Sequence, residues 1–460
     1  MLFSSITFLY FFLPLTIFLY YVVPQRAKNF VLFVMSVLFY AWGEPVYVFL
    51  MLAEIVAAYV LTVLMQRFGE RPAGRAFFLL SVIFPFVLLF YFKFSPSLPI
   101  GISFYTFQIV SYCVDVRRGR VKLQKSLLRL ATYVTLFPQL VAGPIVRYED
   151  VAAVIEGNVP KTDTYVSFER GAVRFVIGLS KKVLIANVLG EFVAEVSGLP
   201  HTERGILLSW AYAAAVSLQL YFDFSGYSDM AIGLGAMLGF SFPENFNYPF
   251  IAKSVSEFWR RWHMTLGGWF RDYVYIPLGG NRKGTARWLV NILVVWLFTG
   301  LWHGAEWNFI LWGLSFAVLL IVEKIVRSLV KKRNFLTDLL GHGYMVLVII
   351  ITFLLFHNTE LGVGARDIAG LWHVPSGAVV DRTVNGYLLK NRIGIFVIGL
   401  IAATPMPIKV WRSFCDMISR KGRGVLAVCL LECFFSLMLL VLCTAYLIDG
   451  SFNPFLYFRF

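Results

Sequence analysis

Long apolar runs alternate with short, mostly basic polar segments along the whole chain. A transmembrane helix needs ~20 consecutive apolar residues, and several of these runs are that long. Others are shorter and are broken by Gly, Pro and polar residues, which predicts re-entrant segments. The apolar runs are Leu2–Val23, Phe30–Trp42, Val46–Met65, Ala76–Phe94, Ile100–Val116, Leu127–Ala142, Val173–Val196, Ile206–Phe222, Met230–Phe240, Trp288–Val322, Tyr344–Phe356, Ile393–Ala403 and Val425–Ile448.

The pattern predicts an all-α, polytopic integral membrane protein with about ten to twelve membrane-embedded helices. Arg26 and Lys28 follow the first run, and each later out-and-back pair of apolar runs begins and ends beside basic residues, the second pair ending at Arg117 to Arg120. Because Lys and Arg stay on the cytoplasmic side, these clusters give the protein a defined orientation. The first run, Leu2–Val23, lacks a basic start and a small-residue cleavage site, so we expect an uncleaved span in the cell inner membrane.

Composition supports the same class of protein. The chain is 59% hydrophobic and only 15% charged, whereas a soluble domain is about 45–50% apolar and about 25% charged. The formal net charge of +15 would suggest nucleic acid in a soluble protein. Here the basic residues lie between apolar runs, as the positive-inside rule produces, so we expect membrane lipid as the surroundings and no nucleic acid partner.

One polar interruption in a long apolar segment carries the candidate chemistry. Trp288–Val322 has basic residues on both flanks and contains His303 in the middle of Thr299–Asn308. If both flanks are cytoplasmic, the segment enters and returns with arms of roughly 15 residues, or ~22 Å of helix. Because the hydrocarbon layer is ~30 Å thick, His303 is expected at membrane depth, reached from the cytoplasm and close to the other face.

An ionisable residue at that depth is a functional hypothesis. Neutral imidazole can take a proton from an attacking hydroxyl, and burial keeps the ring neutral. Glu306 or Asn308 could orient the ring of His303, and spacing does not choose between them. The alternative is a structural histidine whose ring is satisfied by a backbone carbonyl.

A second segment, Ser254–Tyr275, is rich in Trp and Arg and predicts a helix in the membrane interface or along a polar cavity. It contains Arg260, Arg261 and His263, and at an interface this histidine could simply be solvated or face lipid headgroups. The remaining histidines and the five cysteines show no metal-site spacing, so we expect no metal.

A third polar stretch, Tyr221–Asp229, places two carboxylates between apolar runs. Asp223 and Asp229 could keep a cavity polar or anchor Arg side chains. A short solvent-exposed loop explains the same spacing equally well.

Together these stretches resemble the membrane-bound O-acyltransferase family, in particular its bacterial alginate O-acetyltransferase branch. The motifs occur in the family's order and span about Leu98 to Gly313. They are Leu98–Gln108, Phe137–Ile145, Tyr221–Asp229, Phe258–Thr265, Trp269–Tyr273, Ile276–Asn281 and Gly300–Asn308.

The resemblance implies one domain over residues 1–460, with a motif-bearing core at about 98–313, peripheral helices at 1–97 and 341–460, and a thin central funnel. It implies that His303 is the catalytic histidine and His263 the second functional histidine. The sequence departs from the family pattern in two places: Gly267 stands where Ser is usual, and Phe356-His357-Asn358 replaces Phe-Arg-Ala. The residues expected to bind substrate are Trp302, Asn308, Arg260, Arg261, Asp223 and Tyr227.

Members of the family pass an acyl group from a cytoplasmic thioester, usually acetyl-CoA in this branch, towards an extracytoplasmic acceptor. The resemblance therefore implies an O-acetyltransferase without a resident cofactor, acting on an exopolysaccharide such as alginate with a periplasmic acetyltransferase partner. Alternatives are a peptidoglycan or teichoic acid acyltransferase, the latter moving a D-alanyl group. A polysaccharide exporter and a non-catalytic scaffold are alternatives of other classes.

Overall fold

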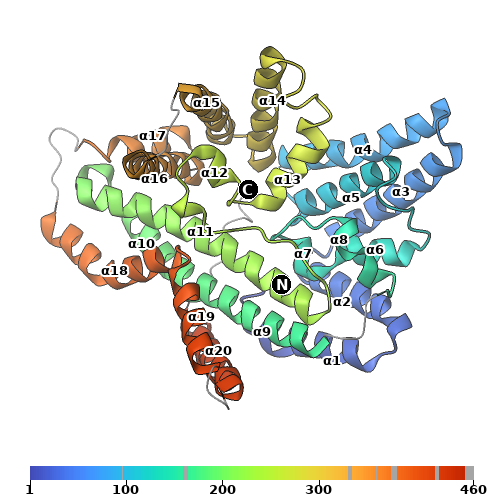
Figure 1. The fold of residues 1–460 in the computed structure, drawn as a ribbon, viewed down its shortest axis with the longest axis horizontal. Coiled ribbons are helices and arrows are strands. Elements are labelled where there is room, and N and C mark those ends of the chain that lie inside the picture. The colour runs from blue at the N-terminus through green and yellow to red at the C-terminus, as the bar shows by residue number, and fades with distance from the viewer. Residues whose placement is uncertain are drawn as a thin grey trace. The chain divides into compact units, whose positions relative to one another are not determined.

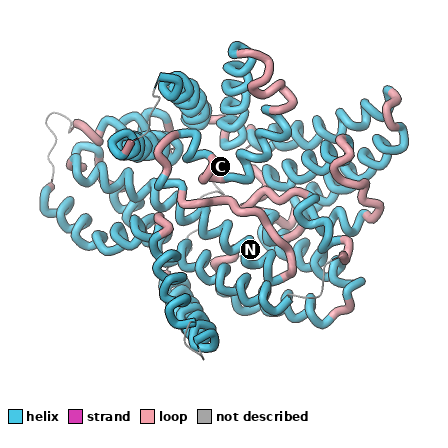
Figure 2. The backbone as a smooth tube through the Cα atoms, in the orientation of Figure 1, coloured by secondary structure: helices cyan, strands magenta, loops and turns pink. Residues whose placement is uncertain are grey.

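The computed structural model describes residues 1–95, 97–158, 164–329, 334–358, 360–373, 381–419 and 424–450. In these ranges the regular structure is entirely helical (Figure 2). Eight of the described helices are long and apolar enough to cross a membrane, and Phe8–Val22 is a shorter apolar helix. The predicted all-α, polytopic architecture is confirmed, while the funnel and the re-entrant segments stay predictions.

The chain divides into two compact units. One consists mainly of Met1–Leu179 and Tyr227–Glu244, and the other mainly of Ser180–Gly226 and Asn245–Tyr446. The single domain expected from the sequence stays a prediction.

In the first unit, the long helices α3 and α4 form a hairpin against the fully buried α5 (Figure 1). Gly101 begins α5 with φ +79°, and a Cβ there would lie 2.7 Å from the Leu140 carbonyl oxygen, so this turn requires glycine. The elements are η1 (Phe8–Phe12), α1 (Leu13–Val22), η2 (Gln25–Ala27), α2 (Lys28–Gly43), α3 (Tyr47–Phe68), α4 (Pro72–Lys93), α5 (Ile102–Arg117), α6 (Leu127–Thr135), α7 (Phe137–Leu140), α8 (Tyr148–Ile155) and α9 (Thr164–Ser180).

The second unit contains both candidate histidines. Its elements are η4 (Lys181–Asn187), α10 (Val188–Ser197), η5 (His201–Glu203), the greater part of α11 (Ile206–Met237), η6 (Pro249–Ile251), α12 (Val255–Trp259), α13 (Met264–Phe270), η7 (Arg271–Tyr275), α14 (Thr285–His303), α15 (Trp307–Leu329), α16 (Phe335–His357), α17 (Leu361–Ala369), α18 (Arg382–Ala402), α19 (Met406–Ser419) and α20 (Gly424–Asp449).

The polar stretch Tyr221–Asp229 lies inside one continuous helix, α11, so its interpretation as a solvent-exposed loop is wrong. The helix continues because the carboxylates have partners. Asp223 Oδ1 lies 2.5 Å from Lys182 Nζ, and both side chains are buried. Lys182 comes from the π-helical turn η4, a rare geometry that often marks functional positions. In the first unit, Asp229 Oδ1 accepts from Arg174 Nη2 at 2.8 Å, which confirms an Arg anchor there.

The hairpin of α14 and α15 is longer than the sequence suggests. The two helices have 19 and 23 residues, so they extend about 28 Å and about 34 Å at 1.5 Å per residue. The predicted arms of roughly 15 residues are therefore too short, because the polar motif continues the helix as far as His303. His303 is the last residue of α14, at the end of the hairpin away from its basic flanks.

Candidate active site

Two histidines from different segments lie near one indole in the second unit. The ring centroid of Trp302 lies 4.6 Å from that of His303 and 6.3 Å from that of His263. His303 comes from the end of α14, whereas His263 precedes α13 by one residue. The structure thus brings together three of the residues singled out by the sequence, although Trp302 and His263 are 39 positions apart in the chain (302 − 263 = 39).

His303 is enclosed by aromatic rings and is only 6% exposed. The planes of Trp312 and Phe356 stand perpendicular to its ring, with centroids at 5.1 and 5.0 Å. These rings shield the imidazole of His303 from water.

Neither residue proposed to orient His303 does so. The Asn308 side chain donates to the carbonyl oxygen of Asn358 instead. Glu306 is exposed, and its carboxylate makes no hydrogen bond within the described part of the chain. Asn308 is 1% exposed, and its Oδ1 has no hydrogen-bond partner among the described residues.

The side chain of His263 is fixed by a hydrogen bond. Its Nδ1 lies 3.0 Å from Asn245 Oδ1, which also accepts from the Thr265 hydroxyl at 2.8 Å. Because Asn245 Oδ1 is an acceptor, Nδ1 carries the proton and Nε2 keeps its lone pair. Nε2 is buried and makes no hydrogen bond among the described residues.

The expectation that His263 is solvated or faces headgroups is wrong, because the side chain is only 2% exposed. Burial lowers the pKa of His263 to about 3, so the ring is neutral at working pH. Its backbone has φ +42°, a conformation in which His is more frequent than most residues. The predicted single helix over Ser254–Tyr275 is therefore broken here into α12, α13 and η7.

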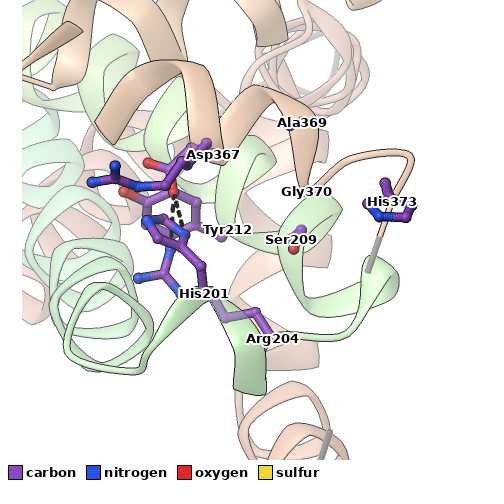
Figure 3. Close-up of a pocket in the computed structure, with 9 residues that line it drawn as sticks. His201, Arg204, Ser209, Tyr212, Asp367, Ala369, Gly370 and His373 are labelled. Carbon is purple, nitrogen blue, oxygen red and sulfur yellow. Dashed lines mark hydrogen bonds and ion pairs between the residues drawn. The ribbon is translucent and has the colours of Figure 1, made fainter. Parts of the chain in front are cut away.

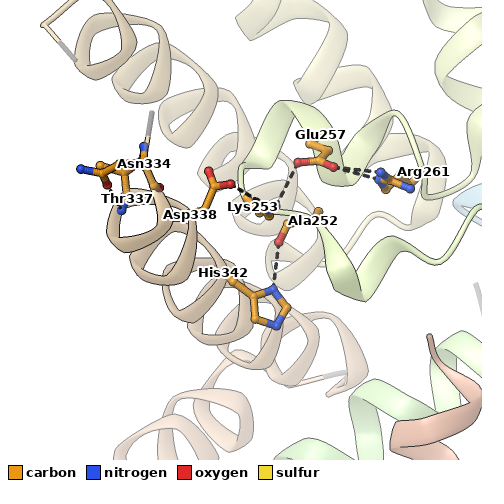
Figure 4. A network of polar contacts seen from close by, with 8 residues as sticks. All are labelled: Ala252, Lys253, Glu257, Arg261, Asn334, Thr337, Asp338 and His342. Carbon is orange, nitrogen blue, oxygen red and sulfur yellow. Dashed lines mark hydrogen bonds and ion pairs between the residues drawn. The ribbon is translucent and has the colours of Figure 1, made fainter. Parts of the chain in front are cut away.

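The two neighbouring arginines differ in what they bind. Arg261 donates to Glu257 Oε1 through Nε and Nη2 and to the Asn247 carbonyl through Nη1, so its guanidinium is occupied structurally. The same network continues through Lys253 (Figure 4). Arg260 is exposed, and among the residues that the structure describes it donates only from Nε, to the Ser256 carbonyl at 3.0 Å. Of the two, Arg260 has nitrogen donors available to an anionic ligand.

An aromatic cluster that the sequence did not single out connects this region with His303. Trp259 packs against Trp296, Trp312 and Phe316, with ring centroids 4.6, 5.8 and 4.9 Å away. The indole Nε1 atoms of Trp259 and Trp312 are buried without a hydrogen-bond partner among the described residues. Buried donors without partners are rare and are candidate contacts for a ligand. From the sequence, only the pairing of two helices across a turn could have predicted that Trp312 lies near His303.

Asp223 and Tyr227, the two remaining residues predicted to bind substrate, lie in different surroundings. Asp223 is neutralised by Lys182, and the next residue, Phe224, places its ring 4.7 Å from that of His263. Tyr227 belongs to the first unit, where it stacks on Phe3 with centroids 4.7 Å apart. Its predicted role in substrate binding stays a prediction.

A cavity of about 330 Å³ lies at the basic end of the hairpin, between α12 and the facing ends of α14 and α15. Lys324 Nζ stands 3.5 Å above the centroid of the Trp288 ring in its wall. Glu323 Oε2 accepts from the Ser256 backbone amide at 3.1 Å on the same side. The cavity thus presents a cation and an aromatic face next to the segment that carries Arg260.

Comparison with known proteins gives matches over most of the chain. The sequence model of the membrane-bound O-acyltransferase family matches residues 5–361. The probable alginate O-acetylase of Pseudomonas syringae pv. tomato is 39% identical over 80% of this chain and 74% of its own length. The peptidoglycan O-acetyltransferase of Helicobacter pylori is 32% identical over 73% and 72%. The teichoic acid D-alanyltransferase of Bacillus subtilis is 32% identical over 55% and 65%.

Proposed function

The chain belongs to the membrane-bound O-acyltransferase family, and on that basis we propose that it transfers acetyl groups from cytoplasmic acetyl-CoA for O-acetylation of an exopolysaccharide such as alginate. That it is an O-acyltransferase and a multi-pass protein of the inner membrane follows from the family and its relatives. The polysaccharide is proposed because an alginate O-acetylase matches more of this chain than the peptidoglycan and teichoic acid enzymes do.

The observation that carries the proposal is the pair of buried histidines whose rings both lie near that of Trp302. In the proposed step, His303 removes the proton of an acceptor hydroxyl while the hydroxyl oxygen attacks the thioester carbonyl. The C–S bond breaks, the acetyl group passes to the acceptor oxygen, and the thiolate takes up a proton. General-base catalysis of this kind typically contributes about 10²–10⁴ in rate.

His263 is proposed to position one reactant. Its Nε2 lone pair can accept a hydrogen bond from a hydroxyl or an amide, because Asn245 holds the proton on Nδ1. The buried indole donors of Trp259 and Trp312 are proposed to bind carbonyl oxygens of the donor as it approaches His303.

The donor is proposed to enter at the basic end of the hairpin. There, Arg260 and Lys324 offer positive charge to the phosphates of acetyl-CoA, and Trp288 offers a flat face. The extended α14 then separates this entrance from His303 by the depth of the membrane. An acceptor reaching His303 from the other face would complete a transfer across the bilayer, and a periplasmic acetyltransferase partner is proposed to receive the group there.

The test uses the purified full-length protein with acetyl-CoA labelled in the acetyl group. We expect donor consumption and label transfer to a polysaccharide acceptor, and loss of both in His303→Gln. His342→Gln is the matched control, because this histidine lies in α16 and, within the described part of the chain, its side chain bonds only to the Ala252 carbonyl. Full activity of His303→Gln would refute the role of His303, and co-purification with partners without donor consumption would favour a scaffold. Label transfer to peptidoglycan or teichoic acid, but not to the polysaccharide, would reassign the acceptor.

A further inference from the structure

Asp367 is a buried carboxylate of α17 that bonds to two different segments of the second unit. Its side chain lines a small cavity together with Arg204 and His201, which come from the connection between α10 and α11 (Figure 3). Asp367 Oδ1 accepts from Arg204 Nη1 at 2.9 Å, and His201 Nδ1 lies 3.4 Å from the same oxygen. Asp367 Oδ2 accepts from Asn358 Nδ2 at 3.1 Å. One carboxylate therefore joins the α10–α11 connection to the end of α16.

Arg204 is itself held in place, so that Asp367 has a fixed anchor. Arg204 Nη2 donates to the carbonyl oxygens of Ser197 and Leu199 at 3.1 and 2.8 Å, and its Nε donates to that of Leu199 at 3.1 Å. Both Arg204 and Asp367 are buried. Hydrogen bonds between charged groups are stronger than those between neutral groups. The anchored side of the carboxylate is therefore tightly constrained.

Asn358 follows the last residue of α16 and connects Asp367 to the turn of the α14–α15 hairpin. Besides its bond to Asp367, Asn358 Nδ2 donates to the Leu354 carbonyl at 2.8 Å, which holds the end of its own helix. The Asn358 carbonyl accepts from the side chain of Asn308. Asn308 is the second residue of α15, directly after the turn that follows His303. The hydrogen bonds thus run from Asp367 to the turn beside His303.

Phe356, two residues before Asn358, connects the same helix end to the imidazole. Its ring centroid lies 5.0 Å from that of His303, with the two planes perpendicular. The same ring packs on Trp312 and Phe309, with centroids 5.0 and 5.2 Å away. A shift at the end of α16 would therefore move a ring that stands directly against His303.

The bond between Asn358 and Asp367 is a feature of this chain rather than of the family pattern. That pattern has Ala where Asn358 stands, and an alanine side chain has no amide to donate. A buried ion pair is weak evidence for stability, because the cost of desolvation offsets much of the attraction. Its hydrogen bonds do fix distance and direction, which matter most next to a reacting group.

We propose that Asp367 is a positioning residue for the reaction, which acts through Asn358 on the two elements that orient His303: the ring of Phe356 and the α14–α15 turn. The inference rests on the proposed function and adds to it a residue that touches neither reactant. Misplacement of a catalytic group by about 1 Å can cost about 10²-fold in rate. Loss of the Asn358–Asp367 bond should therefore slow the chemical step and leave donor binding unchanged.

The test exchanges the donor and the acceptor of this bond in the full-length protein in detergent. Asp367→Asn sets two amides against each other, and Asn358→Asp sets two carboxylates against each other, so each single change breaks the bond. The double variant restores it with the roles reversed. Asn385→Asp is the matched control, because Asn385 is also buried and bonds to Gly205 and Glu203 in the same α10–α11 connection.

Two measurements separate positioning from folding. The first is kcat and KM for labelled acetyl-CoA, where each single variant should lower kcat by about tenfold or more and leave KM within about twofold. The second needs no donor: diethyl pyrocarbonate modifies histidine rings, and mass spectrometry gives the rate at His303 relative to that at His342. Loosening Phe356 should raise this ratio by about fivefold to tenfold, the equivalent of one hydrogen bond.

The proposal is supported if both single variants change kcat and the His303 modification ratio, and the double variant recovers most of both. A double variant no better than the single ones, or an equal loss of kcat in Asn385→Asp, would overturn it. Asn358→Ala removes the same bond without adding a charge and replaces Asn358→Asp if that variant yields no folded protein. Wild-type protein that never consumes acetyl-CoA would contradict the proposed function, while the modification ratios would still show whether Asp367 holds the surroundings of His303.

Discussion

Both candidate histidines lie near one indole, yet they sit in different local structures. Rings stand around His303, which ends a long helix. A hydrogen bond to Asn245 fixes the tautomer and orientation of His263, which lies at a break between two short helices. The hydrogen bond to Asn245 determines which nitrogen of His263 carries the proton. The first environment suits a base, and the second suits a group that positions a substrate.

The largest expected effect comes from His303→Gln. The change removes the base and keeps a polar side chain of similar length, so the acetylation rate should fall by about 10²–10⁴. Labelled acetyl transfer, together with the yield of folded protein in detergent, checks this. A larger loss in His263→Gln than in His303→Gln would reverse the two roles.

Asn245→Ala tests the hydrogen-bonded histidine. It removes the acceptor of the His263 Nδ1 proton and leaves a buried donor unsatisfied, at a cost of about 1–3 kcal/mol, so activity should fall by about tenfold to a hundredfold. Asn245→Asp keeps an acceptor at this place and should recover part of that loss. If Asn245→Asp is no more active than Asn245→Ala, the hydrogen bond is not what matters.

The same environment predicts a pH dependence. Because burial lowers the pKa of His263 to about 3, its ring is already neutral throughout the physiological range. His263→Gln should therefore lower the rate by one constant factor between about pH 5 and 8, without changing the shape of the profile. A pH–rate profile of the wild type and this variant checks it, and loss of an ionisation in that range would contradict the neutral ring.

Trp312→Phe tests the aromatic surroundings of His303. The aromatic face next to the imidazole remains, while the buried indole N–H disappears, so kcat/KM for acetyl-CoA should fall by about fivefold to tenfold. Trp296→Phe is the control within the same cluster, because its ring packs on Trp312 and Phe316. Equal effects of the two changes would show that packing, not the donor, is responsible.

The smallest effect is expected at the entrance. Arg260→Gln removes an exposed charge and should raise the KM for acetyl-CoA by about twofold to fivefold, with kcat unchanged. The increase should shrink at high salt, because exposed charges are screened. Arg261→Gln should instead lower the thermal stability, since it breaks the bonds to Glu257 and Asn247. A change in kcat for Arg260→Gln would place this residue nearer the chemistry than proposed.

The apolar runs and basic clusters were sufficient to predict a polytopic helical protein, because hydropathy and charge act locally along the chain. They also singled out His303, since an ionisable group in an apolar segment stands out against its neighbours. The continuity of α11 could not be predicted in this way. It depends on Lys182, 41 positions before Asp223 (223 − 182 = 41), and on a π-turn that directs the amine inwards.

The detailed geometry of the site could not be predicted from the sequence, for the same reason. The break at His263 depends on a left-handed backbone and on Asn245, 18 residues earlier. Trp312 comes next to His303 only because two helices pair across a tight turn. Spacing proposed Glu306 or Asn308 as the orienting residue, yet Asn308 bonds to the end of α16. Contacts between segments that are far apart in the sequence leave no trace in the local spacing of apolar and polar residues.

The close packing of the hairpin has a consequence for enzyme engineering. A methyl group on Gly300 would come 2.5 Å from the Phe309 carbonyl, and one on Gly313 would come 2.4 Å from that of Trp296. The backbone of the hairpin near His303 therefore leaves no room for a larger residue at either glycine. Attempts to accommodate longer acyl chains should trim the movable rings of Trp312 and Phe356 and leave the glycines untouched.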